Sequence, residues 1–294
     1  MTSVAVLAHT GKSLGGGLPE LRDVLAREGV DAPLWYEVPK SKKAPKKVKE
    51  AVADGADLLF VWGGDGMVQR CIDAVATTST TIAIVPAGTA NLLAKNLGIP
   101  EDIERAVHIG LHGSRRMLDV GVMNGERFAV MAGAGLDALM IRDMGDGLKG
   151  RAGKLGYVWA GAKNLGEQRF VMKVRVDGRR WFSGKASCVL VGNVGTVLGG
   201  LSLFPHALPD DGKLEIGVVT AKGLLDWART LRRLVMSRPE RSPFVHVSSG
   251  RTFDIRLDRK RPYQLDGGDR TSKKRFRVSI EPAAVAICLG GDAS

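Results

Sequence analysis

Four residues at the end of an apolar run, Gly63, Gly64, Asp65 and Gly66, have the types and spacing to do chemistry. They lie in FVWGGDGMVQR, residues 60–70, where a strand pattern gives way to a helical one. In an open parallel sheet, ligands bind beyond the carboxyl ends of the strands. A glycine-rich loop there exposes backbone N–H groups to phosphate, and the helix dipole adds to the attraction. The pattern predicts a nucleotide loop whose carboxylate, Asp65, serves a metal ion or its water shell.

Two common phosphate-binding motifs do not fit the chain. The dinucleotide pattern G-x-G-x-x-G would need glycine at Gln69. A Walker A pattern ending in the GKS of residues 11–13 would need glycine at Val6. A plain tight turn, in which Asp65 only caps the following helix, is the alternative to a phosphate loop.

A second loop favours the phosphate interpretation. The stretch PAGTANLLAKNLGIP, residues 86–100, again places glycine and small polar residues between a strand pattern and a helical one. The residues concerned are Pro86, Gly88, Thr89 and Asn91. Successive strand–turn–helix units of one sheet bring such loops to the same edge, so we expect the two loops to lie side by side and to cradle phosphates together.

The elements around these loops predict an α/β domain. From residue 3 to about 113, short apolar runs alternate with helical patterns. Strands are predicted at 3–9, 32–38, 57–62 and 81–86, and helices at 18–29, 46–55, 68–78, 90–98 and 101–111. This alternation, with apolar β-branched strands, indicates a parallel sheet that helices cover on both faces.

From about residue 115, the chain predicts a mostly antiparallel β-sandwich domain. Strand patterns occupy 115–135, 170–182, 186–194, 213–219, 252–258 and 275–282. The Asn-Gly at 124–125 and the Asp-Gly at 177–178 are typical hairpin turns. Helical inserts are expected at 153–166 and 222–237, and the apolar run 284–289 is expected to return to the first domain. The predicted domains are 1–120, completed by 283–294, and 121–282.

The order of motifs resembles the diacylglycerol kinase catalytic domain family, which includes bacterial lipid kinases and sphingosine kinases. GGDG and PAGTANLLAKNLGIP are followed by RRMLDVG, AGAGLDA, GKLGYVWAG, GNVGTVLGGLSLFPHALPDDGKLEIGVV and YQLDGG, which together cover nearly the whole chain in order. The resemblance implies an NAD-kinase-like nucleotide-binding domain followed by a β-sandwich. It also implies a cleft between the two that receives ATP and a lipid hydroxyl.

The resemblance implies roles for individual residues. It assigns the nucleotide to Gly63, Gly64, Asp65, Gly66, Gly88, Thr89 and Asn91, and a structural magnesium to Asp210, Asp211 and the Leu214 carbonyl. Asp119 matches an acidic position near the cleft. Two adjacent carboxylates at a turn before a strand also suit a hard cation that takes oxygen ligands. The expected cofactors are ATP and Mg²⁺.

The chain departs from the family pattern at four positions. Met67 stands where the family usually has threonine, Arg70 where it has glutamate, and Leu92 where it often has aspartate. Gly268 stands where the family's acidic base, a glutamate, is expected. These departures put the strength of catalysis in doubt.

Phosphoryl transfer needs a phosphate cradle, Mg²⁺ and a carboxylate that accepts the proton of the attacking hydroxyl. The catalytic candidates are Asp269, Asp266 and Asp65. If Gly267 and Gly268 form a bulge, Asp269 could reach the position of the missing glutamate, so it is the predicted base. Asp266 is the alternative base, although an aspartate at that point typically caps the turn.

Composition indicates anionic partners. The net charge is +12 and the isoelectric point is near 9.8, which suits nucleotide and an anionic membrane surface. Aromatic residues are only 5% and no RNA-binding motif is present, so nucleic acid is not expected. No signal peptide or membrane-spanning segment is evident, and the three cysteines lie in apolar runs, as in a reduced cytosolic protein. We therefore expect a cytoplasmic protein that associates peripherally with the inner face of the cell membrane. A homodimer is left open.

The sequence therefore predicts a lipid kinase that transfers the γ-phosphate of ATP to a lipid hydroxyl. Diacylglycerol, a monoacylglycerol, a sphingoid base and a glycolipid precursor all offer a hydroxyl beside an apolar tail. The alternatives are a soluble kinase of the NAD kinase type and a catalytically weak membrane-binding relative.

Overall fold

The computed structural model describes residues 2–76, 78–135, 169–197, 201–223, 225–227, 229–230 and 242–290. The chain forms two compact units. Unit 1 comprises Met1–Val120 and Pro282–Ser294, and unit 2 comprises Gly121–Glu281. Strands β5 (Ser114–Met123) and β16 (Gly268–Leu289) each run from one unit into the other.

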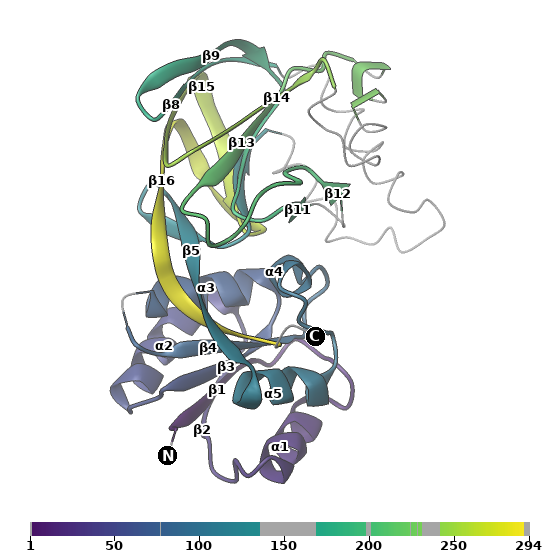
Figure 1. Ribbon diagram of the computed structural model, residues 1–294, viewed down its shortest axis with the longest axis vertical. Helices are drawn as coiled ribbons and strands as arrows, with labels where there is room; N and C mark the ends of the chain where they lie inside the picture. The colour runs from purple at the N-terminus through teal and green to yellow at the C-terminus, as the bar shows by residue number, and fades with distance from the viewer. Residues whose placement is uncertain are drawn as a thin grey trace. The chain divides into compact units, whose positions relative to one another are not determined.

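The sheet of unit 1 is parallel (Figure 1). Its strands are β1 (Val4–His9), β2 (Leu34–Val38), β3 (Leu58–Gly63) and β4 (Thr81–Pro86). They lie in the order β2-β1-β3-β4, and the end of β16 pairs in parallel with β4, Ile287 opposite Ile82. Every residue of β3 and β4 is buried, as expected for strands that are covered on both faces.

The helices of unit 1 pack in pairs. They are α1 (Gly17–Arg27), α2 (Ala44–Ala53), α3 (Asp65–Val75), α4 (Leu92–Asn96) and α5 (Ile103–His112), with a short 3₁₀ turn η1 (Ser41–Lys43). Helix α2 packs on α3, and α1 packs on α5. A Cβ at Gly110 would lie 2.3 Å from the ring of Phe60, so this glycine lets α5 lie directly on the sheet.

Unit 2 is antiparallel. Its longer strands are β6 (Glu126–Phe128), β7 (Met131–Ala134), β8 (Phe170–Val176), β9 (Arg179–Ala186), β10 (Cys188–Gly192), β13 (Leu214–Val219), β14 (Val245–Gly250) and β15 (Thr252–Leu265). Two strands of two residues each, β11 (Thr196–Val197) and β12 (Leu201–Ser202), pair with each other in a separate sheet. The strand order β14-β13-β10-β7-β15 continues from β15 to β8 and β9.

Strand β15 connects two parts of the antiparallel unit. Its residues 253–257 pair with β8, and its residues 263–265 pair with β7. Register shifts between Arg256 and Tyr263 bend the strand between these two pairings. The core contains Phe128, Phe170, Phe253, Tyr263 and Phe276, all buried. Aromatic burial on this scale is a large part of the driving force for folding.

The predicted fold class is confirmed, with a parallel α/β unit and an antiparallel β-sandwich. Both predicted hairpins form: Asn124 and Asp177 have φ of 54° and 49°, each followed by a glycine of positive φ. Helix α4 is shorter than the predicted 90–98, because Asn91 has φ 49° and ψ 47° and cannot continue a right-handed helix. The predicted insert 153–166 and most of the predicted insert 222–237 lie outside the described residues.

In the part of the chain that the structure describes, none of the helices combines the length and apolar character needed to cross a bilayer. The three cysteines, Cys71, Cys188 and Cys288, are buried, as their apolar surroundings in the sequence predict.

Candidate active site

The two glycine loops of unit 1 touch through their backbones. Gly63 and Pro86 are register partners at the ends of β3 and β4, so the loops leave the sheet side by side. A Cβ at Gly88 would lie 2.3 Å from the Cα of Gly64, and a Cβ at Gly64 would lie 3.0 Å from the Cα of Gly88. Only glycine fits at Gly88 without backbone movement, and any larger residue at Gly64 would press on its neighbour. One structural role of the glycines in GGDG is therefore to let the two loops contact each other through their backbones.

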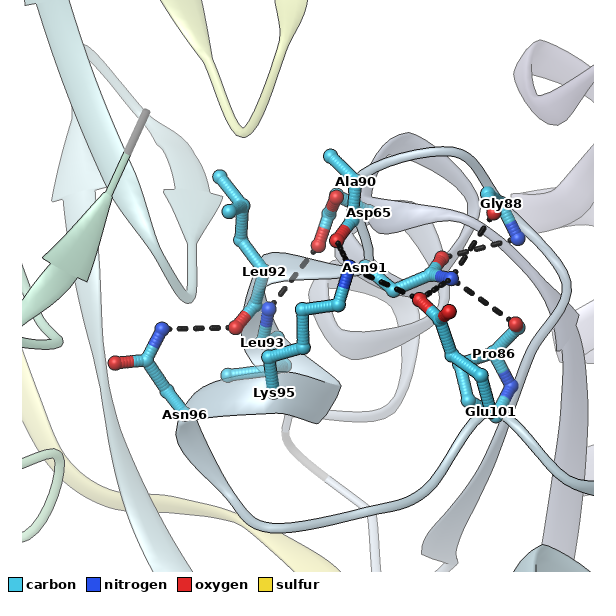
Figure 2. A network of polar contacts seen from close by, with 10 residues as sticks. All are labelled: Asp65, Pro86, Gly88, Ala90, Asn91, Leu92, Leu93, Lys95, Asn96 and Glu101. Atoms are coloured by element: carbon cyan, nitrogen blue, oxygen red, sulfur yellow. Dashed lines mark hydrogen bonds and ion pairs between the residues drawn. The ribbon is translucent and has the colours of Figure 1, made fainter. Parts of the chain in front are cut away.

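Asn91 holds the second loop in shape. Its side chain is buried, and its backbone takes the left-handed conformation that asparagine tolerates better than most residues. The Oδ1 atom accepts the N–H of Gly88 at 2.9 Å, while Nδ2 donates to the carbonyl oxygens of Pro86 and Gly88 at 3.0 Å. One side chain thus satisfies three backbone groups of the loop (Figure 2).

The network continues to a residue that sequence reasoning missed. Asn91 Nδ2 also lies 2.9 Å from Glu101 Oε1, and Lys95 Nζ lies 3.0 Å from the same oxygen. These donors lower the pKa of Glu101, the Asn91 bond contributing most. Lys95 Nζ in addition donates to the carbonyl of Ala90 at 2.7 Å. No local sequence signal links Glu101 to the loop, because the contact spans ten positions.

Asp65 connects the first loop to the helix of the second. It is the first residue of α3, and the N-cap residue of that helix is Gly64. Its Oδ1 accepts the N–H of Leu93, in α4, at 3.1 Å. Burial raises the pKa of Asp65, and the N–H groups of Leu93 and Leu92 and the charge of Lys95 only partly offset this. The negative charge of Asp65 is therefore incompletely compensated by the protein.

The first turn of α3 has one open side. A Cβ at Gly63 would lie 2.7 Å from the Cβ of Met67, which is buried, so position 67 points into the protein and not toward solvent. A Cβ at Gly66, by contrast, would meet no protein atom within 4 Å. Thr89 is exposed on the second loop, and Gly66 is partly exposed, as Gly64, Asp65 and Gly88 also are.

In unit 2, Asp266 binds backbone and not solvent. It is buried, and its carboxylate accepts three N–H groups, from Ala129 at 2.7 Å, Val130 at 2.9 Å and Met131 at 2.8 Å. Both oxygens are used, Oδ2 by Ala129 and Oδ1 by the other two. This candidate base thus fixes the start of β7.

The bulge at Gly267 and Gly268, on which the prediction of Asp269 as base depended, is absent. Asp266 and Gly267, with φ of 43° and 79°, form a two-residue hairpin turn, and Leu265 pairs with Gly268. Asp269 pairs with Gln264 in continuous register. Because side chains alternate along a strand, Asp269 points to the opposite face from position 268. Asp269 is exposed, so its carboxylate is open to solvent, and its role as base stays a prediction.

The predicted metal residues Asp210 and Asp211 are both exposed, and Leu214 begins β13. Asp211 Oδ1 accepts the N–H of Lys213 at 2.9 Å, which shapes the turn. Glu215, which sequence reasoning missed, has a raised pKa, first through burial and then through the charge of Asp211. Neighbouring carboxylates with oxygen ligands suit a hard cation, so the donor set fits Mg²⁺.

Asp119 has a structural partner. It is buried in β5, and its Oδ1 accepts the N–H of Ala283 at 2.8 Å, where Ala283 has a φ of 47°. The bond fixes the backbone of β16 within unit 1. The resemblance matched Asp119 to an acidic position near the expected cleft, but no local sequence pattern indicated its hydrogen bond with Ala283.

The chain matches two family models that are consecutive along it. The model described as diacylglycerol kinase catalytic domain matches residues 8–123, and the model described as YegS C-terminal NAD kinase beta sandwich-like domain matches residues 130–289. The glycine loops lie in the first match, and Asp210, Asp211, Asp266 and Asp269 lie in the second.

Curated relatives share about a quarter of their residues with the chain. A protein named "Probable lipid kinase YegS-like" from Enterobacter sp. (strain 638) is 28% identical over 85% of this chain and 83% of its own. A protein named "Diacylglycerol kinase" from Bacillus subtilis (strain 168) is 27% identical over 76% of this chain and 75% of its own.

Solved structures share the fold. The crystal structure of a diacylglycerol kinase from Bacillus anthracis str. Sterne has a TM-score of 0.79 at 22% identity, and covers 99% of this chain and 98% of its own. An NAD kinase from Archaeoglobus fulgidus, solved in complex with ATP, has a TM-score of 0.53 at 11% identity over 97% and 92% of the two chains.

Proposed function

The chain belongs to the family that joins a diacylglycerol kinase catalytic domain to a YegS C-terminal NAD kinase beta sandwich-like domain, and from this membership we propose that it is an ATP-dependent lipid kinase. The reaction transfers the γ-phosphoryl group of ATP to the hydroxyl of a lipid such as diacylglycerol. One observation carries the proposal beyond family membership: two glycine loops interlock at the carboxyl ends of neighbouring parallel strands, with an open helical turn at Gly66.

The nucleotide is assigned to the two loops. The N-terminus of α3 offers backbone N–H groups and a favourable dipole to phosphate, and Gly66 leaves room for the ligand. Asn91 and the contact of Gly64 with Gly88 hold the loops in place without a ligand, which lowers the entropy lost on binding. Thr89 offers an exposed hydroxyl at the same edge.

Asp65 is assigned to Mg²⁺ or its water shell. Its carboxylate is incompletely compensated by neighbouring donors, and this fits a nearby cation. Bound Mg²⁺ would neutralise the charge that develops on the transferred group. Asp210, Asp211 and the Leu214 carbonyl are assigned to a second, structural Mg²⁺, with Glu215 as a neighbour.

The proton of the attacking hydroxyl is assigned to Asp269. Its carboxylate is exposed, whereas both oxygens of Asp266 already accept backbone N–H groups. A base must reach the proton that it takes, and an exposed side chain at a hairpin end can reorient toward a substrate. Asp266 is the weaker candidate.

Transfer of label from [γ-³²P]ATP tests the function. We expect label in the chloroform-extractable fraction with a lipid acceptor and none on NAD. Label on NAD alone would make the chain an NAD-type kinase, and the absence of label on any acceptor would overturn the kinase proposal. A panel of diacylglycerol, monoacylglycerol, sphingoid base and glycolipid acceptors then identifies the lipid.

We further propose that the enzyme works at the cytoplasmic face of the membrane, on an anionic surface. The net charge of +12 supports this, because a positively charged protein is attracted to an anionic lipid surface. Binding to vesicles should strengthen with their anionic lipid content and weaken with salt. Equal binding to neutral vesicles at all salt concentrations would contradict the electrostatic mechanism.

A further inference from the structure

A cluster of metal-ligating side chains lies in unit 1, apart from the glycine loops. It consists of Glu28, which caps the C-terminus of α1, and of His108 and His112 on α5. One ligand atom from each of the three residues lies within 4.8 Å of the others. Among the described residues, this is the only group of three or more histidine, cysteine or acidic side chains so close together.

The geometry of α5 places the two histidines together. Residues four apart lie on one face of a helix, one turn above the other. The ring centroids of His108 and His112 are 4.8 Å apart. Histidines at this spacing on one helical face are a recurring way to bind a metal ion through two imidazole nitrogens.

Glu28 supplies the third ligand from another helix. Its Oε2 lies 2.9 Å from His112 Nε2, and its Oε1 lies 3.8 Å from His108 Nδ1. In a tetrahedral zinc site with bonds of about 2.0–2.1 Å, ligand atoms stand roughly 3.3 Å apart. The two measured separations lie on either side of that value, and all three ligand atoms lie within 4.8 Å of one another, so rotations of the exposed side chains would form the site.

The scaffold that carries the cluster is fixed by packing. Helix α1 packs on α5, and α5 buries Ile103, Ala106, Val107 and Gly110 on the side that faces the protein. Arg27, next to Glu28, forms an ion pair of 2.7 Å with Glu104 of α5. The ligands therefore project from two helices that are already held together.

The electrostatic setting favours a cation. Glu28 follows the C-terminus of α1 and His112 ends α5, and the C-terminal end of a helix carries partial negative charge. The positive charge of Arg27 is engaged by Glu104.

We propose that Glu28, His108 and His112 form a binding site for one divalent transition-metal ion, with Zn²⁺ as the best-fitting species. Two imidazole nitrogens and one carboxylate oxygen suit Zn²⁺, Ni²⁺ and Cu²⁺, whereas Mg²⁺ prefers oxygen ligands alone. Three protein ligands leave a position for water. The ion would clamp α1 to α5, and this site is independent of the proposed Mg²⁺ of catalysis.

The experiment measures Zn²⁺ affinity by competition with a chromogenic chelator on the full-length protein. The variants are His108→Ala/His112→Ala, Glu28→Gln and the control His246→Ala, which removes an exposed histidine of unit 2. We expect each ligand change to weaken binding at least about tenfold, in line with the sensitivity of metal sites to their shells, and the control to bind as the parent does. Circular dichroism verifies that each variant is folded.

Two further readouts distinguish a real site from adventitious binding. Zn²⁺ should raise the melting temperature of the parent but not of the double histidine variant. In histidine ring NMR spectra, Zn²⁺ should shift the signals of His108 and His112 and not that of His246. Unchanged affinity in the double variant, unchanged affinity in Glu28→Gln, or shifts spread evenly over all histidines would each overturn the proposal.

Discussion

Two turns of the molecule use aspartate beside glycine for different purposes. In the loop after β3, glycines make backbone contact with a second loop, and burial raises the pKa of Asp65. In the turn after β15, Asp266 and Gly267 form a hairpin, and the Asp266 carboxylate is satisfied by three N–H groups. Chemistry is therefore expected at Asp65, where the carboxylate can still gain from a cation, and architecture is expected at Asp266.

The largest expected effect is on stability at Asp266. Replacing Asp266 by alanine leaves three buried N–H groups without an acceptor, at about 1–3 kcal/mol each. Alanine also tolerates the φ of 43° poorly. We expect Asp266→Ala to lower the free energy of unfolding of unit 2 by about 3 kcal/mol or more, measured by urea denaturation.

Asp269 is the matched control in the same hairpin. Because its side chain is exposed, Asp269→Asn should change stability by less than about 0.5 kcal/mol. Because Asp269 is the proposed base, Asp269→Asn should nevertheless lower the rate of lipid phosphorylation by about 100-fold. Full turnover in Asp269→Asn, together with loss of turnover in a folded Asp266→Asn protein, would reverse the assigned roles.

At Asp65 the comparison predicts an effect on turnover. Asparagine keeps an oxygen for the N–H of Leu93, so Asp65→Asn should fold, but it lacks the charge that attracts Mg²⁺. We expect turnover to fall by about 100-fold, because charge stabilisation at the transferred group is among the largest catalytic effects. Near-normal turnover in the folded variant would remove Asp65 from the mechanism.

The two glycine loops give a matched pair of variants. Gly88→Ala places a Cβ 2.3 Å from the Cα of Gly64 and should lower stability by about 1–3 kcal/mol. Gly66→Ala meets no protein atom within 4 Å and should leave stability unchanged or slightly higher. Gly66→Ala should instead weaken ATP binding, measured by nucleotide titration. Parental ATP affinity in Gly66→Ala would show that this turn does not approach the phosphates.

Three turns that contain Asn-Gly or Asp-Gly show how much of the local structure could be predicted from the sequence. Asn124-Gly125 and Asp177-Gly178 were predicted as hairpins because the dipeptide alone favours the turn. Asp266-Gly267 carries the same signal, yet the additional Gly268 suggested a bulge, and the register excludes it. The dipeptide alone therefore predicted the turn correctly at 124–125 and 177–178, where no second glycine follows it.

Contacts between distant residues could not be predicted. The two loops were expected to be neighbours because parallel strands end at one edge, but the touching backbones at Gly64 and Gly88 depend on the exact pairing of β3 with β4. The bonds from Asp266 to residues 129–131 span more than 130 positions, and no local pattern encodes them. The roles of Asp65, Asp210, Asp211 and Asp269 stay predictions.

The smallest expected effect concerns a third aspartate, Asp254, whose partners are charged side chains and not backbone. Arg275 Nε lies 2.7 Å from its Oδ1, and Arg256 Nη2 lies 2.8 Å from its Oδ2. These bonds, Arg275 foremost, lower the pKa of Asp254 to about 2. The pairs are partly exposed, so solvent screening limits their contribution to less than about 1 kcal/mol.

A pKa that is lower in the folded state stabilises the fold above the unfolded value of about 3.9 and loses that effect as the pH falls toward 2. We therefore expect the unfolding free energy of unit 2 to decrease between about pH 4 and pH 2, and Asp254→Asn to flatten part of that decrease. Asp258→Asn, which removes an exposed charge from the same strand, is the control for the loss of one negative charge. High salt should reduce the difference between Asp254→Asn and the parent, because these pairs are screened, whereas the loss in Asp266→Ala should persist. If the stability losses in Asp266→Ala and Asp254→Asn depended equally on salt, the distinction between an aspartate bound to backbone N–H groups and one bound to arginine side chains would be contradicted.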